Sequence, residues 1–480
     1  MFETGFGKKK IVKDISANTL QTFITQLFGL VIFYFTSRYL AKEDFGEYNW
    51  SMAVGTTIIT IASLGLDVVF IKRIALNENI LVISGIHFFH TLLVGILFSV
   101  LVLLIQSIFP SFKHYHPLFF IVFVHLSLIN ISNSFRLCLI GLETYKSLAV
   151  TALITNVFKF VIILGLYFIR YFTITNVVYA FIISTTLELV LGYFFVSRRV
   201  SAKIKPVLKV KEYKYFIIES LPQLGVVFFD SALARIDWIL LGIISTASIT
   251  AEYSFAYRMY ESSKLPLIII SPILLTRFTK LLRRGGKVED KNIKDIQLFY
   301  KVELFIVMLI PIVLVCSWAP LIDYFTNNKY GQVNTLNYIL LAGCVPLHCV
   351  SNFLWSIGFA QGQLKTIMYI TIAVALINFG LNYFLIPFYG SNGAAIAFLA
   401  STVIQTLLYV KYMDQKIIKL NVKVTIIAFI NAVASILIAK SLTNNIIFVT
   451  VLALVISVVI GILTRQLNIK EIKTILVKTE

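Results

Sequence analysis

The sequence predicts an all-α membrane protein with about 14 transmembrane helices, and two observations carry this prediction. Of the 480 residues, 58% are hydrophobic and only 14% are charged, with a mean hydropathy of +0.88. Apolar runs of about 20 residues recur along the chain, and each is long enough to cross a hydrocarbon core of about 30 Å. Helices are the expected spanning elements, because lipid offers the backbone no hydrogen-bond partner and the strands of a membrane barrel would alternate in polarity.

The predicted spans cover most of the sequence, and their even number places both termini on one side of the membrane. They lie near residues 16–37, 48–70, 80–106, 117–140, 148–169, 174–196, 216–244, 251–276, 300–322, 336–360, 366–387, 391–412, 424–441 and 444–463.

The distribution of basic residues supports this set of spans. The formal net charge of +19 would suggest a nucleic-acid ligand in a soluble protein, but here most Lys and Arg residues fall in short loops. With the N-terminus in the cytoplasm, about 30 of the 42 Lys and Arg residues lie inside and about six outside. The loop "SRRVSAKIKPVLKVKEYK" (197–214) alone holds seven of them. We therefore expect cytoplasmic termini and no nucleic-acid partner.

The two halves of the sequence resemble each other. "SNSFRLCLIGLETYKS" (132–147) compares with "SNFLWSIGFAQGQLKT" (351–366), and "EDFGEYNWSMA" (43–53) compares with "SITAEYSFAYR" (248–258). Matches in the same order at similar offsets predict two six-helix lobes related by pseudo-two-fold symmetry, followed by two C-terminal helices. The predicted domains are an N-terminal lobe with spans 1–6 (1–200), a basic cytoplasmic linker (201–215), a C-terminal lobe with spans 7–12 (216–413), and two extra helices with a basic tail (414–480).

The sequence lacks the motifs of several enzyme classes. It has no GxxxxGK[ST] phosphate loop, no HExxH metal motif and no GxSxG nucleophile turn. His87 and His90 lie one helical turn apart, but packed histidines are commoner than metal ligands, so we expect no metal there. We expect no enzyme activity and no cofactor. Without a nucleotide site, uphill transport would draw on an ion gradient.

Charged residues within the spans are the main candidates for function, because a charge at membrane depth costs about 3 kcal/mol on insertion scales. The basic residues expected to line a cavity between the lobes are Lys159, Arg258, Lys264 and Arg235. The acidic candidates for ion coupling are Asp230, Glu188, Glu261 and Asp237. A cationic cavity would suit an anionic ligand, since phosphate oxygens accept charge-assisted hydrogen bonds. The alternative for each residue is an internal ion pair that joins two helices, such as Lys159 with Glu188.

The first span adds an uncharged polar face. Asn18, Gln21 and Thr25 recur there at helical spacing. Sugar hydroxyls could bind to such a face, and hydrogen bonding between helices is the alternative use.

Three stretches resemble the bacterial polysaccharide flippases for O-antigen and capsule, which belong to the multidrug/oligosaccharidyl-lipid/polysaccharide exporter superfamily. "SRYLAKEDFGEYNWSMAV" is similar to the family signature after the first span. "ARIDWILLGIISTASITAEYSFAYRMYE" resembles the junction of the seventh and eighth spans, and "NFGLNYFLIPFYGSNGAAIAFLASTVIQTLL" resembles that of the eleventh and twelfth. The resemblance covers nearly the whole chain.

This resemblance implies alternating access between two six-helix lobes in the bacterial cytoplasmic (inner) membrane. Family members flip sugar chains linked to undecaprenyl pyrophosphate, often with ion coupling, and basic residues hold the pyrophosphate or acidic sugars. Lys159 and Arg258 lie deeper within their predicted spans than Arg235, so they match this role better. The implied partners are the lipid-linked oligosaccharide, membrane lipids, H⁺ or Na⁺ as coupling ion, and the polysaccharide polymerase and chain-length machinery.

Two alternatives remain at this point. A multidrug or cation antiporter of the same fold would need a carboxylate-rich, aromatic cavity, whereas basic residues predominate in the spans here. A polymerase or a non-transporting scaffold is the other alternative. A polymerase would be expected to have a large outer loop, and every predicted outer loop is short.

Overall fold

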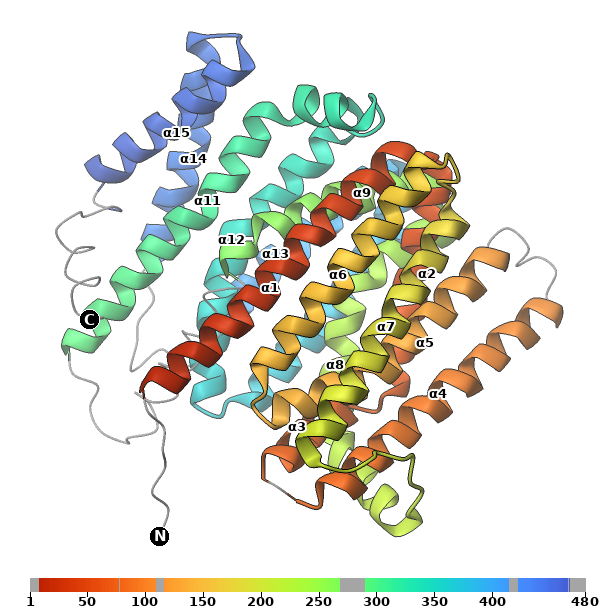
Figure 1. Cartoon of the computed structure of the whole chain (residues 1–480). Helices are drawn as coiled ribbons and strands as arrows, with labels where there is room; N and C mark the ends of the chain where they lie inside the picture. Colours follow the sequence, from red (N-terminus) through yellow and green to blue (C-terminus); the bar gives the residue numbers. More distant parts are fainter. Residues whose placement is uncertain are drawn as a thin grey trace. The chain divides into compact units, whose positions relative to one another are not determined.

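The computed structural model describes residues 8–76, 78–108, 116–267, 290–413, 422–464 and 466, and all regular secondary structure in these ranges is helical (Figure 1). This confirms the predicted all-α class. The chain divides into two compact units, Met1–Gly242 and Ile243–Glu480. The predicted domain limits differ from this division and stay a prediction.

The first unit contains α1 (Lys8–Tyr39), α2 (Lys42–Ala62), α3 (Leu66–Ala75), α4 (Ile80–Ile108), α5 (His116–Gly141), α6 (Tyr145–Phe168), α7 (Ile174–Val200) and most of α8 (Val210–Ile244). The second unit contains α9 (Ala247–Ser263), α11 (Asp290–Thr326), the short 3-10 helix η2 (Gln332–Asn334), α12 (Thr335–Ala360), α13 (Leu364–Tyr412), α14 (Val422–Leu442) and α15 (Ile446–Leu463).

The helices agree with the predicted spans. In the described ranges, nine helices are long and apolar enough to cross a membrane, and α2 and α3 meet the same test as a bent pair. Helix α13 has 49 residues and is broken at Gly390, where φ is 55° and ψ is −129°. Its length of about 70 Å exceeds two hydrocarbon cores, so α13 contains two spans. Helices α1 and α8 cover the first and seventh predicted spans, and α9 covers the first part of the eighth, which makes the structure consistent with fourteen.

The second predicted span, residues 48–70, is not one straight helix. Helices α2 and α3 meet at an angle of 56°. Leu64 and Gly65 in the connection both have a positive φ, of 54° and 70°. A Cβ atom on Gly65 would lie 2.9 Å from the Cβ atom of Gln223 in α8. Glycine therefore permits both the left-handed backbone and the close approach of α8.

Two histidines of α4 hold this break. The imidazole of His87 is fully buried, stacks on Phe70 at 4.2 Å and lies with Nε2 3.1 Å from Oδ1 of Asp67. His90 donates a hydrogen bond from Nε2 to the carbonyl oxygen of Ala62 at 3.1 Å. The last carbonyl group of α2, which has no partner within its own helix, is thereby hydrogen-bonded. Within the described chain, no group of three or more His, Cys, Asp or Glu residues could hold a metal ion. The contacts of His87 and His90 join α4 to both sides of the break.

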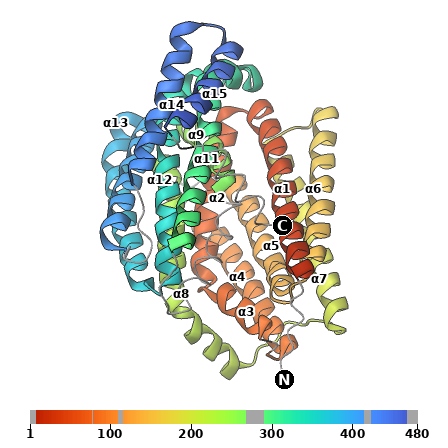
Figure 2. The same ribbon diagram turned by 90° about the vertical axis from the view of Figure 1, so that its left-hand side faces the viewer.

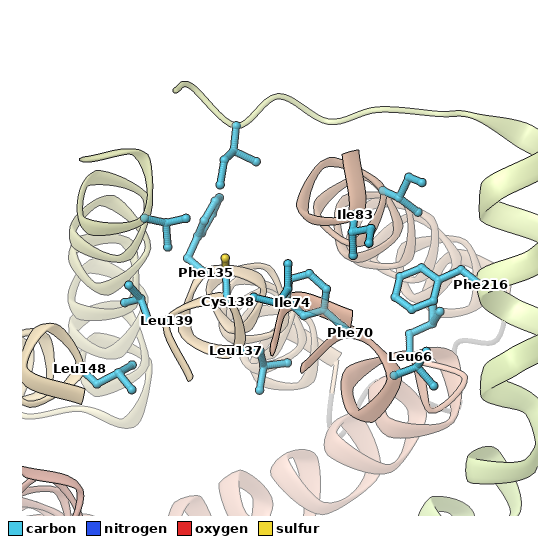
Figure 3. Packing of buried hydrophobic residues seen from close by; sticks show 14 residues of the cluster. Leu66, Phe70, Ile74, Ile83, Phe135, Leu137, Cys138, Leu139, Leu148 and Phe216 are labelled. Atoms are coloured by element: carbon cyan, nitrogen blue, oxygen red, sulfur yellow. The ribbon is translucent and has the colours of Figure 1, made fainter. Parts of the chain in front are cut away.

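A hydrophobic cluster packs α3 against its neighbours (Figure 3). Phe70 and Ile74 of α3, Phe135 of α5 and Phe216 of α8 are each at most 2% exposed. A Cβ atom on Gly141, at the end of α5, would lie 2.7 Å from Cγ2 of Ile74. This close packing fixes the end of α5 and with it the turn that leads into α6.

The local backbone agrees with the predicted internal repeat. Helix α1 ends at Tyr39 and α2 begins at Lys42. Helix α8 ends at Ile244 and α9 begins at Ala247, each 205 residues after its counterpart. The α5–α6 turn recurs between α12 and α13 at an offset of 219 residues.

The two turns also share their hydrogen bonds. Thr144 N donates to Leu139 O at 2.9 Å, and Gln363 N donates to Gly358 O at 2.8 Å. The residue before each donor has a positive φ, as in a Schellman helix end. Both units therefore build the same helical hairpin.

Candidate functional site

A polar cavity lies inside the first unit, between α1, α5, α6 and α7. Its volume is about 110 Å³. Its lining consists of Gln21, Thr25, Ser132, Arg136, Leu139, Leu148, Thr151, Ala152, Thr155, Asn156, Lys159, Glu188 and Gly192. Helices α1 and α6 run side by side in both views (Figure 1, Figure 2), and α6 also contacts α7. Four of the residues singled out from the sequence meet here: Lys159, Glu188, Gln21 and Thr25.

Helical spacing explains why these side chains share one cavity. On α6 the lining residues recur every three or four positions from Leu148 to Lys159, so they form one face. On each of the other three helices, two lining residues lie four positions apart and therefore on the same face. These pairs are Gln21 and Thr25, Ser132 and Arg136, and Glu188 and Gly192.

The cavity contains two basic side chains and one acidic side chain. Lys159 Nζ lies 5.6 Å from the ring centroid of Phe181, a cation–π distance. No ion pair joins Lys159 or Arg136 to a carboxylate in the described ranges. Glu188 lines the cavity but does not neutralise Lys159 by direct contact, so the internal ion pair considered from the sequence is not formed here.

The polar groups of α6 are arranged to accept hydrogen bonds from a ligand. The hydroxyls of Thr151 and Thr155 donate to Ser147 O at 2.9 Å and to Thr151 O at 2.8 Å. Asn156 donates its amide to Ala152 O at 2.7 Å. These donors are occupied within the helix, while the side-chain oxygens keep acceptor capacity. The cavity therefore offers cations for an anion and acceptors for hydroxyl groups.

The other predicted residues of the first unit do not line this cavity. Asp230 is exposed on α8, whereas Asp237 is fully buried on the same helix. The guanidinium carbon of Arg235 lies 5.2 Å from the ring centroid of Trp238. The side chain of Asn18 lies outside the described residues.

Arg258, Glu261 and Lys264 belong to the second unit. Arg258 and Glu261, one turn apart on α9, form an ion pair with an N–O distance of 2.9 Å. Lys264 Nζ lies 4.3 Å from the ring centroid of Tyr260. Helix α9 ends at Ser263, and Lys264 caps it, so Lys264 lies just beyond the regular helix that carries Arg258 and Glu261. Residues 268–276 of the predicted eighth span lie outside the described residues. Arg258 has its charge partner within its own helix.

Sequence reasoning did not select Arg136, Ser132 or the threonines of α6. Arg136 lies only five residues before the end of α5, where an arginine can reach the membrane surface and needs no functional explanation. The spacing of Ser132 and Arg136 on one face was the available signal.

Comparison with known proteins places the chain in a family. The family model for "Polysaccharide biosynthesis protein" matches residues 11–276, which is more than half of the chain. The chain belongs to this family. No curated protein matches the chain.

Solved structures show the fold of this member of the polysaccharide biosynthesis family. A lipid II flippase MurJ in an inward closed conformation has a TM-score of 0.74 and 14% identity, over 93% of this chain and 98% of that one. An inward-facing multidrug resistance MATE transporter of the MOP superfamily has a TM-score of 0.65 and 15% identity, over 81% and 96%. A MOP superfamily transporter from Pyrococcus furiosus has a TM-score of 0.56 and 15% identity, over 89% and 96%. The protein is thus a multi-pass membrane protein with this transporter fold.

If the cavity is filled with water, Ala152→Cys will react with a water-soluble methanethiosulfonate reagent. Ala152 lines the cavity, whereas the neighbouring Leu153 does not line it and is 45% exposed, on a surface of α6 that we expect to face lipid. Leu153→Cys is the matched control and should react much more slowly, because the reagent does not enter lipid. The four native cysteines are buried and should give little background. Equal reaction rates at the two positions would contradict a hydrated cavity.

Proposed function

We propose that this protein is a flippase that moves undecaprenyl-pyrophosphate-linked oligosaccharide units across the cytoplasmic membrane by alternating access. The observation that carries the proposal is the cavity of the first unit, with its surplus of cations inside a helical membrane domain. Arg136 and Lys159 line it together with a single carboxylate, Glu188. Membership of a polysaccharide biosynthesis family supports a substrate from that chemistry.

The chemistry of the lining fits one end of such a substrate. Arginine and lysine bind phosphate oxygens through charge-assisted hydrogen bonds, which are stronger than bonds between neutral groups. A cavity of about 110 Å³ has room for one charged group with some water, but not for several sugars. The proposed role of the cavity is therefore to hold the anionic headgroup while the sugar chain and the isoprenyl chain lie outside it.

The alternative function is a multidrug or cation antiporter of the same fold. The similarity to a MATE transporter supports it at the level of fold. The lining of the cavity argues against it, because two cations and one carboxylate would repel a cationic drug. The polymerase and chain-length machinery remain predicted partners.

We expect cytoplasmic termini, because the basic loops follow the positive-inside rule. Ser201 lies in the basic segment after α7 and is exposed. Ser201→Cys should therefore resist labelling by a membrane-impermeant reagent added to intact cells, and should label after the membrane is opened. Ready labelling from outside would reverse the proposed orientation.

Replacing Lys159 should weaken transport without loss of the protein from the membrane. A charge-assisted bond contributes about 1.5–3 kcal/mol, so Lys159→Ala should lower the rate of flipping in proteoliposomes about tenfold to a hundredfold. Lys159→Arg should retain most of the rate. Lys203→Ala removes an exposed lysine outside the cavity and serves as the control. An unchanged rate in Lys159→Ala would argue against the cavity as the substrate site.

Ion coupling is proposed for Asp230, which lies within a predicted span and is exposed in the described structure. Asp230→Asn cannot bind and release a proton at that position, so transport should lose its dependence on a pH gradient while substrate binding is kept. Glu212→Gln, at an exposed glutamate near the start of α8, is the control. Transport by Asp230→Asn that still follows the pH gradient would exclude this role.

A further inference from the structure

A hydrogen-bonded network lies beside the break between α2 and α3, and none of its residues lines the cavity of the first unit. The fully buried imidazole of His87 is its centre. Nε2 of His87 lies 3.1 Å from Oδ1 of Asp67 on α3, and Nδ1 lies 3.0 Å from the hydroxyl oxygen of Ser134 on α5. The side chain of Asp67 is 40% exposed, so the network reaches the protein surface at one end.

The direction of each hydrogen bond follows from the single proton that a hydroxyl group can donate. The hydroxyl of Thr91 on α4 donates to the carbonyl oxygen of Phe88 at 3.0 Å. Thr91 therefore accepts its second hydrogen bond, which comes from Ser134 at 2.9 Å. Because Ser134 has then used its own proton, it accepts from Nδ1 of His87, and Nδ1 carries a hydrogen atom.

The contact between Nε2 of His87 and Oδ1 of Asp67 needs a hydrogen atom as well. A bare ring nitrogen and a carboxylate oxygen are both acceptors, so they would repel each other at 3.1 Å. With Nδ1 already occupied, the pair is an imidazolium beside a carboxylate or an imidazole beside a carboxylic acid. Both forms have a net charge of zero. This neutrality suits a site within a predicted span, where an uncompensated charge is costly.

His90, one helical turn further along α4, shows the contrast. Its Nε2 donates to the carbonyl oxygen of Ala62, and its Nδ1 lies 2.8 Å from the hydroxyl oxygen of Tyr213 on α8, which can donate to it. A neutral ring with hydrogen at Nε2 satisfies both contacts. One helix thus carries a histidine whose contacts require an additional proton and another whose contacts do not.

The charges around the network leave the neutralisation of Asp67 to His87. In the described ranges, the ion pair with His87 is the only one that Asp67 forms. The other charged or titratable side chains around the network are Lys72, Arg73, His90, Cys138, Tyr213 and Glu219. The two basic side chains of α3 in this set pair with Glu219 of α8. The positive charge beside Asp67 therefore has to come from a proton.

We propose that Asp67 and His87 form a proton-binding site of the first unit, and that the site holds its proton in this arrangement. The site goes beyond the proposed substrate cavity and does not depend on the identity of the substrate. Release of the proton needs no movement of a helix: when Thr91 turns its hydroxyl toward Ser134, Ser134 can donate to the bare Nδ1. Asp67 is the exposed end at which the proton exchanges with water.

The test is solid-state NMR of the full-length protein in lipid bilayers, with 15N in the histidine rings and 13C in the aspartate carboxyl groups. At about pH 7.5 a histidine with the usual pKa of about 6.5 is mostly neutral. His87 should nevertheless carry hydrogen on Nδ1, with a second hydrogen on Nε2 or on the Asp67 carboxyl group. In Asp67→Asn the amide can donate to Nε2, so His87 should lose one of its two hydrogens.

His90 is the internal control and should carry hydrogen at Nε2 alone in both proteins. Spectra of His87→Gln and His90→Gln assign the two rings. A bare Nδ1 on His87 in the parent, or a bare Nε2 beside an ionised Asp67, would refute the site. Two ring hydrogens that persist on His87 in Asp67→Asn would refute it equally. The parent spectrum decides even if a variant fails to fold, and a negative result leaves the flippase proposal intact.

Discussion

The cost of placing a charge within a bilayer is the constraint on which this structure depends. A charged side chain at membrane depth must face water, a partner or a ligand, since lipid solvates none of its charge. Arg258 meets this demand through Glu261 on the same helix. Lys159 and Arg136 line a cavity instead. Lys159 and Arg136 thus mark the place where an anion can enter the first unit.

The broken second span supports that cavity from one side. The bend between α2 and α3 brings the short helix α3 against the end of α5, where Ile74 packs against Gly141. His87 and His90 hold the two sides of the bend through Asp67 and the carbonyl of Ala62. The cavity residues Leu139 and Leu148 belong to the same hydrophobic cluster (Figure 3). Packing around α3 therefore sets the position of the helices that carry Arg136 and Lys159.

Much of this arrangement could be predicted from the sequence, and the reasons for the rest are physical. Long apolar runs predicted the helices, and the repeat of 132–147 in 351–366 reappears as two turns with the same hydrogen bonds. Lys159 and Glu188 were found because mid-span charges are rare. The bend at Gly65 was not predicted, since a single glycine in an apolar run is compatible with a straight helix. Arg136 was missed because an arginine near a helix end needs no ligand to be tolerated.

The central claim is that the cavity of the first unit binds the anionic headgroup of a lipid-linked sugar. The most direct measurement is a cryo-EM structure of the protein in nanodiscs, with the lipid-linked oligosaccharide extracted from the cells that produce the protein. The account predicts diphosphate density between α1, α5, α6 and α7, within about 3 Å of Arg136 or Lys159. Substrate density elsewhere on the protein, with this cavity empty of it, would contradict the account.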